Sequence, residues 1–249
     1  MDFTFTEDQE TVAKVARQLF EHRATPEHLT ELEAADVRYD AGLWRELASA
    51  DLLGISLPGS VGGSGRGFVE LALLLAEVGW SVAPVPAYAT LLLGADTLAR
   101  YGDEAQKKHY LPAVIDGTLL LSAGLTEPGR ADATRPATTA RRDGGGWRLD
   151  GTKELVPAAQ LARTILIPAA LDDGDVGVFL LDADSGGVEI RPAATTNGEP
   201  HADVILDGAV VSDRLPGDGR GILESLYARA LVGLCAIQLG VTERALLMA

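Results

Sequence analysis

The hydrophobic periodicity of this chain changes twice, and the order of the patterns limits the fold more than any other feature. Up to residue 117, apolar residues recur at helical spacing. From 118 to 220 they form short runs bounded by Gly, Asp and Pro, as in the strands of a small sandwich or barrel. We therefore predict an α+β multidomain fold, with an all-α domain at 1–117 and a middle antiparallel β-domain at 118–220. Residues 221–249 would be the first helix of a C-terminal helical-bundle domain.

Local signals place the helices. Thr6 and Gln9 have the spacing of a capping box, in which each residue satisfies the backbone of the other. The apolar run Phe68–Val78 predicts a buried helix. A helix starting at Leu43 should end near Gly54, because glycine readily takes a left-handed cap. Further helices are expected over residues 87–101, 104–115 and 221–249, where the helical pattern still runs at the last residue.

Strands are expected in the middle of the chain. Three glycines at 144–146 precede Trp147 and indicate a hairpin. The expected strands are residues 119–124, 147–151, 164–167, 176–181, 188–190 and 204–206.

Charge and cysteine content exclude several classes of protein. The chain carries 36 acidic and 21 basic residues, a formal charge of −15, which disfavours a nucleic-acid-binding face. Cys235 is the only cysteine, so neither an intrachain disulfide nor a thiolate metal cluster can form. Its apolar neighbours indicate a small core residue. Residues 1–8 show no signal or transit leader, and no apolar stretch is long enough to cross a bilayer. We expect a cytoplasmic protein with no membrane partner.

Two patterns resemble ligand sites and are better explained otherwise. The glycines of residues 62–67 have neither the preceding strand nor the following Gly-Lys-Ser/Thr of a phosphate loop, so a connector between helices is favoured. No two histidines lie four residues apart on an expected helix, so no metal site is expected. His201 lies two residues from both Glu199 and Asp203, but the preceding proline favours an exposed bend.

Three motifs in order resemble the acyl-CoA dehydrogenase family across essentially the whole chain. Residues 53–58 with 61–65 resemble its N-terminal signature, and residues 123–129, Ala-Gly-Leu-Thr-Glu-Pro-Gly, resemble its flavin-binding segment. Residues 150–153, Asp-Gly-Thr-Lys, resemble the hairpin before its second flavin-contacting loop, with Asp in place of Asn.

The resemblance implies FAD as cofactor and an acyl-CoA as substrate. Backbone groups of an extended Leu-Thr segment can pair with the edge of a flavin, and a threonine hydroxyl adds another bond. Taken alone, Thr-Glu-Pro-Gly also fits a turn after a strand. The cofactor-binding residues implied are Ala123, Leu125, Thr126, Gly129, Ala131, Leu155 and Pro157. The helices of residues 68–98 would line the acyl pocket.

The flavin segments depart from the family pattern in two places. Ala131 stands where a serine is usual, in a stretch one residue shorter, which removes a polar contact. Leu155-Val156-Pro157 replaces Trp-Ile-Thr or Trp-Ile-Ser in the loop expected after Lys153. Leucine lacks the flat aromatic face, and proline has neither a hydroxyl nor an N–H to offer near flavin N5.

No catalytic residue is expected within these residues. The family's glutamate base usually lies later than residue 249, and Ala230 occupies the alternative base position on the first C-terminal helix. Glu224 and Glu243 are too far along that helix to replace it.

Two hypotheses follow. One is a subunit that helps to oxidise an acyl-CoA to its 2,3-enoyl-CoA with FAD, in a hetero- or homo-oligomer with a homologous subunit, such as a dimer of dimers. Its composition resembles actinobacterial heteromeric members, some acting on steroid-derived acyl-CoAs. The other is a catalytically silent subunit that stabilises an active partner. A homomeric dehydrogenase seen without its last third stays a third option.

Overall fold

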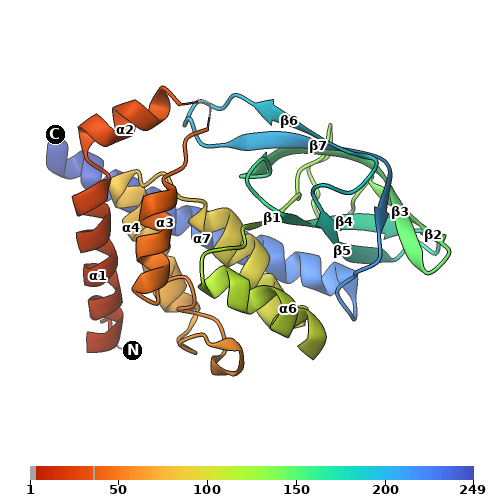
Figure 1. The fold of residues 1–249 in the computed structure, drawn as a ribbon, viewed down its shortest axis with the longest axis horizontal. Coiled ribbons are helices and arrows are strands. Elements are labelled where there is room, and N and C mark those ends of the chain that lie inside the picture. Colours follow the sequence, from red (N-terminus) through yellow and green to blue (C-terminus); the bar gives the residue numbers. More distant parts are fainter. Residues whose placement is uncertain (1–3, 36) are drawn as a thin grey trace.

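Helices form the N-terminal part of the computed structural model, which describes residues 4–35 and 37–249 (Figure 1). These helices are α1 (Glu7–Arg23), α2 (Pro26–Glu33), α3 (Ala41–Ser49), the short η1 (Gly59–Val61), α4 (Phe68–Ser81), η2 (Tyr88–Asp96), α5 (Thr97–Tyr101) and α6 (Glu104–Ile115). The predicted capping box is confirmed, because the Thr6 hydroxyl accepts from the Gln9 amide and the Gln9 side chain accepts from the Thr6 amide. Residues 1–3 of the segment judged to lack a leader are outside the described residues.

Two helices differ from the prediction. The helix that begins at Ala41 ends at Ser49, not near Gly54, and the left-handed residue is Asp51, with a φ of 57°. The chain leaves the helix early because Leu52 and Leu53 turn into the core. The helix expected at 87–101 is continuous, but η2 has the wider turn of a π-helix.

The middle of the chain is one curled sheet. Its strands are β1 (Leu121–Ala123), β2 (Thr139–Asp143), β3 (Gly146–Pro157), β4 (Thr164–Leu171), β5 (Val176–Asp182), β6 (Val188–Ala193) and β7 (His201–Val211). The order is β1-β4-β2-β3-β7-β6, with β5 on β4. Most pairs are antiparallel as predicted, whereas β4 pairs in parallel with β1 and β2. Sequence patterns miss β2 because only Ala140 of its residues is buried.

Strand β3 runs through the segment expected to be a loop after Lys153. It pairs with β7 as far as Pro157, and a register shift lies between Lys153 and Val156. Leu155 sits in this bulge with a φ of 49°. Non-glycine residues rarely adopt positive φ, so the bulge holds Leu155 in a strained conformation.

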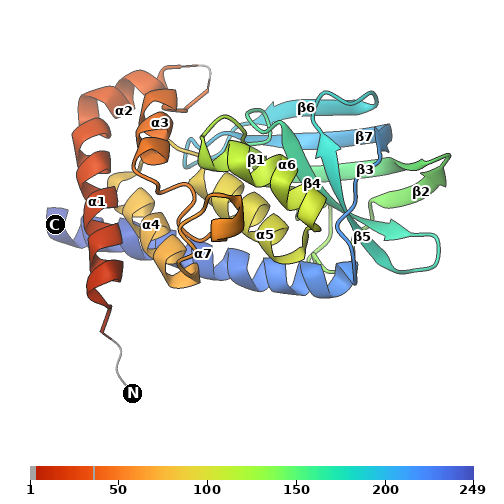
Figure 2. The ribbon, with the colours of Figure 1, turned by 60° about the horizontal axis from the view of Figure 1, so that its bottom comes forward.

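Helix α7 (Gly219–Met248) spans the length of the molecule and packs along α4 (Figure 2). Glycines allow the close crossing: a Cβ on Gly240 would lie 1.9 Å from the Ala76 carbonyl oxygen, and one on Gly79 would lie 2.1 Å from that of Ile237. Helix α7 thereby joins the helical part to the β-sheet, since it also contacts β5.

The placement of Cys235 in the core was wrong, because its side chain is exposed. Gly233, Ile237 and Gly240 share the face of α7 that meets α4, and Cys235 lies about 200° around the helix from Gly233. An apolar run on a helix cannot by itself show which face finds a partner.

The expectation that no stretch could cross a bilayer also needs correction. Among the described residues, helix α7 is long and apolar enough to cross a membrane, with a mean hydropathy of 1.5. The core helices of soluble proteins can be equally long and apolar, so the length and composition of α7 are weak evidence for a membrane span.

Candidate functional site

The fold places the two predicted flavin segments against each other. The Glu154 amide donates to the Thr126 carbonyl oxygen at 2.9 Å, and the Ser122 hydroxyl donates to the Pro157 carbonyl oxygen at 2.5 Å. Gly124 permits this contact, because a Cβ there would lie 2.8 Å from Cγ of Lys153. Residues 28 and 35 positions apart in the sequence therefore lie side by side.

A buried ion pair fixes the two segments. The Lys153 ammonium lies 2.6 Å from Oε1 of Glu127, and the two side chains are 1% and 3% exposed. The Glu127 carboxylate also accepts from the amides of Ala137 and Thr138 and from the Thr138 hydroxyl. Sequence reasoning missed this role, because both residues stood in motifs without any signal that they would meet.

The two charges perturb each other's titration. Burial lowers the pKa of Lys153 to about 8, although the Glu127 carboxylate opposes the shift. Burial alone would raise the pKa of Glu127, but the Lys153 charge and the four hydrogen bonds outweigh it and hold this pKa below its ordinary value. Glu127 is therefore ionised at neutral pH.

We expect acid to weaken the fold through Glu127. The pKa of Glu127 in the folded state lies below the ordinary 4.5, so the unfolded chain binds the proton more readily. The stabilisation is present above pH 4.5 and is lost as the pH falls through the folded-state pKa. Urea midpoints measured between about pH 7 and pH 3 should fall more steeply for the wild type than for Glu127→Gln. Equal slopes for the two proteins would contradict this assignment.

The segment 125–126 offers free hydrogen-bond donors. Thr126 is exposed and Leu125 is half-buried, and neither amide nor the Thr126 hydroxyl bonds to a described residue. Such an edge fits the acceptors of a flavin pyrimidine ring. The second predicted flavin segment, which contains Leu155 and Pro157, adds no further donor. The Leu155 amide already donates to Oδ1 of Asp203 at 2.9 Å, and Pro157 has no N–H.

The remaining predicted cofactor residues occupy different environments. Ala123 is fully buried at the end of β1, so its methyl group faces the core. Gly129 and Ala131 are exposed, and Gly129 turns the chain with a φ of 65°. The Leu155 side chain is 49% exposed. Pro157 is half-buried and lines a cleft.

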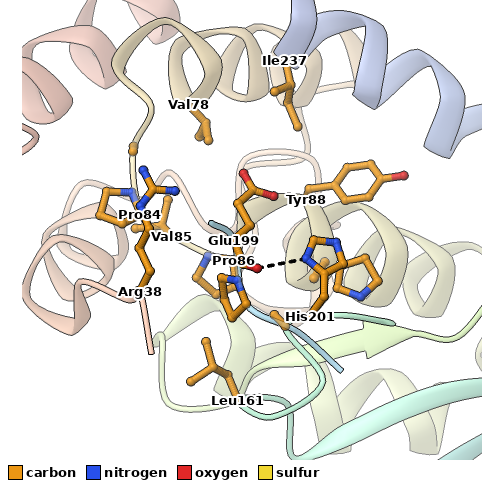
Figure 3. A pocket seen from close by; sticks show the side chains of 15 residues that line it. Arg38, Val78, Pro84, Val85, Pro86, Tyr88, Leu161, Glu199, His201 and Ile237 are labelled. Atoms are coloured by element: carbon orange, nitrogen blue, oxygen red, sulfur yellow. Dashed lines mark hydrogen bonds between the residues drawn. The ribbon is translucent and has the colours of Figure 1, made fainter. Parts of the chain in front are cut away.

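This cleft lies between α4, α7, the end of β3 and the start of β7, and it has a volume of about 700 Å³. Its wall is mostly apolar, and its polar groups come from the segment before α3, from the β6–β7 connection and from Gln238 of α7. Figure 3 shows the adjoining smaller pocket, which shares Arg38, Glu199 and His201 with the cleft. The main apolar lining residues are Val78, Ala83, Tyr88, Leu231, Leu234 and Ile237. The cleft could therefore hold a long apolar group.

No proton-abstracting carboxylate projects from α7 into this cleft among its described residues. Ala230 is buried, and its carbonyl oxygen accepts from the Tyr88 hydroxyl at 3.4 Å. Glu224 and Glu243 are exposed and line none of the described cavities.

His201 differs from the expected exposed bend, because it begins strand β7 and lines the cleft. Its Nδ1 lies 3.1 Å from the Glu199 backbone oxygen, whereas the Asp203 carboxylate accepts a hydrogen bond from the Leu155 amide. The described residues contain no cluster of acidic residues, histidines or cysteines able to hold a metal ion.

Comparison with known proteins accounts for this arrangement. Residues 6–118 match the model of the acyl-CoA dehydrogenase N-terminal domain, and residues 122–209 match that of the middle domain. The chain belongs to the acyl-CoA dehydrogenase family. Acyl-CoA dehydrogenase FadE27 of Mycobacterium tuberculosis (strain ATCC 25618 / H37Rv) is 32% identical over 249 residues, which are all of this chain and 65% of that protein.

Solved acyl-CoA dehydrogenases share the fold. The ChsE4–ChsE5 complex of Mycobacterium tuberculosis aligns with a TM-score of 0.93 at 33% identity, covering 100% of this chain and 67% of that one. A variant of the Tcur3481–Tcur3483 steroid acyl-CoA dehydrogenase aligns with a TM-score of 0.90 at 39% identity, covering 97% and 65%. An acyl-CoA dehydrogenase of Bacillus anthracis, solved with FAD, aligns at 0.87 and 26% identity over 97% and 43%. The chain thus spans up to about two thirds of these relatives.

Proposed function

We propose that this acyl-CoA dehydrogenase-family chain takes part in the FAD-dependent oxidation of an acyl-CoA to its 2,3-enoyl-CoA, as one subunit of a heteromeric cytoplasmic complex. The observation that carries the proposal is the paired backbone of 124–127 and 153–157, with unused donors at Leu125 and Thr126 beside an apolar cleft. The ChsE4–ChsE5 and Tcur3481–Tcur3483 relatives, which are complexes, support the heteromeric part.

Each group in this chain would have a limited task. Bound FAD supplies the acceptor for the hydride that leaves the β-carbon of the substrate. The Leu125 and Thr126 amides and the Thr126 hydroxyl would hold the pyrimidine edge. The cleft would bind the acyl group and exclude water. Removal of the α-proton needs a carboxylate, and Ala230 cannot supply one, so we assign that base to a group outside residues 1–249.

A second candidate function is a silent subunit that stabilises an active partner. Two observations favour it: the Leu155 amide already donates its hydrogen bond to Asp203, and Pro157 has no N–H group. The edge where flavin N5 would lie therefore has no donor from either residue.

Flavin content separates the two functions. We expect the chain purified alone to lose flavin on gel filtration and the chain co-expressed with a homologous partner to keep it, as read from visible absorption. In the co-expressed complex, Thr126→Val should lower flavin occupancy, because the variant keeps the shape but loses the hydroxyl donor.

Thr11→Val is the matched control, since Thr11 is exposed on α1, and Figure 1 shows this helix at the opposite end of the molecule from the sheet. An unchanged flavin content in Thr126→Val would favour the silent subunit. Stable, stoichiometric flavin together with dehydrogenase activity in the isolated chain would contradict the heteromeric proposal.

A further inference from the structure

A buried arginine that has no counter-ion among the described residues faces the cleft. Arg38 is 8% exposed. Its Nη2 donates to the Val82 carbonyl oxygen at 2.8 Å, whereas its Nε is buried and has no hydrogen-bond partner. No carboxylate among the described residues forms an ion pair with it.

The surroundings of Arg38 leave room for a ligand. Arg38 lines the cleft beside the apolar residues Val78 and Ile237, and Figure 3 shows its guanidinium group directed to the same cavity as Glu199 and His201. The Glu199 side chain is exposed and lines the same cavity, but it forms no ion pair with the guanidinium. The neutral Val82 carbonyl is therefore the sole described acceptor for this cation.

Burying an unpaired charge costs several kcal/mol in a folded protein, so an anion that enters the cavity would recover part of that cost. A guanidinium group presents a planar fork of donors that matches the two oxygens of a carboxylate. An arginine in an otherwise apolar cleft is therefore suited to an acyl chain that ends in a carboxylate, rather than in a methyl group.

We propose that Arg38 binds a carboxylate at the far end of the acyl group, which makes the substrate class the CoA monothioesters of dicarboxylic acids. This inference rests on the proposed function, because it takes the cleft to be the acyl site. Pro157 ties the cleft to the flavin segments, and Arg38 enters it from the segment before α3.

The test compares two matched ligand series in the co-expressed complex. Calorimetry measures the Kd of saturated acyl-CoAs from hexanoyl- to dodecanoyl-CoA and of the corresponding dicarboxylic monothioesters. At the best-fitting length we expect the wild type to bind the dicarboxylic ligand about tenfold more tightly, as a charge-assisted pair allows. Arg38→Met should abolish this preference, whereas Arg38→Lys should retain part of it.

A second variant keeps the test valid if Arg38→Met fails to fold. Glu199→Gln removes a negative charge from the same cavity. It should strengthen the binding of the dicarboxylic ligand but not that of the methyl-ended ligand. Equal affinity for both series in the wild type, or an unchanged preference in Arg38→Met, would overturn the role of Arg38 and leave the proposed function standing. If neither series binds, the acyl site itself is refuted, and the role of Arg38 with it.

Discussion

Replacing Glu127 by methionine should lower the free energy of unfolding by about 3–5 kcal/mol at neutral pH, because it leaves one partner of a buried ion pair uncompensated. The Lys153 ammonium would remain buried without an acceptor, and the Ala137 and Thr138 amides would lose theirs. Urea unfolding followed by circular dichroism measures the loss. Flavin retention in the co-expressed complex should fall with it, since the pair holds the two predicted flavin segments together.

The lysine makes this defect depend on pH. The pKa of Lys153 is already about 8 beside Glu127, and loss of the carboxylate lowers it further. The unfolded lysine titrates near its ordinary 10.5, so between these values the unfolded state binds more protons and stability rises with pH. Glu127→Met should therefore recover part of its loss in mildly alkaline buffer.

The double variant Glu127→Met/Lys153→Met is the control. Removing both charges replaces an ion pair with apolar groups, which is often nearly neutral. It should be more stable than Glu127→Met alone. A double variant as unstable as the sum of the two single variants would contradict the coupling.

Replacing Gly240 by valine should force α4 and α7 apart. The new Cβ would lie 1.9 Å from the Ala76 carbonyl oxygen and 2.7 Å from the Trp80 amide nitrogen. Both atoms belong to a helix backbone, which cannot give way as a flexible side chain can. We expect a loss of about 3 kcal/mol, at the upper end of overpacking effects. Thermal unfolding measures the loss, and hydrogen exchange along α4 should show the same helix opening first.

Leu239→Val provides the matched control. Leu239 is the preceding residue and is 55% exposed, so this variant reports the cost of a β-branched residue in the helix without a clash. A Gly240→Val protein as stable as Leu239→Val would show that the crossing can relax.

The elements with strong periodicity could be predicted, and the contacts between them could not. Residues 104–115 and 221–249 were expected to be helical and do form α6 and α7, because the residue types that favour and cap a helix are local signals. Strand β2 escaped detection since its polar residues point to water. The end of α3 depended on where Leu52 and Leu53 would be buried, which is a tertiary effect.

The candidate site shows the same division. The motifs at 123–129 and 150–153 marked the segments that the fold brings together, because their residue types are local signals. Three contacts join residues that are far apart in the sequence. They are the Glu127–Lys153 ion pair, the Leu155–Asp203 hydrogen bond and the Arg38–Val82 hydrogen bond, which span 26, 48 and 44 positions. A single sequence without aligned relatives contains no signal for such pairings.

The outward face of α7 has a consequence for anyone who handles the protein. Val232, Leu239 and Leu246 recur every seven residues on this face and are 48%, 55% and 77% exposed. A contiguous apolar stripe of this kind is where self-association begins. Melting temperatures and gel-filtration volumes should therefore shift with protein concentration, and any value measured at a single dilution would describe an assembly equilibrium rather than one folded chain.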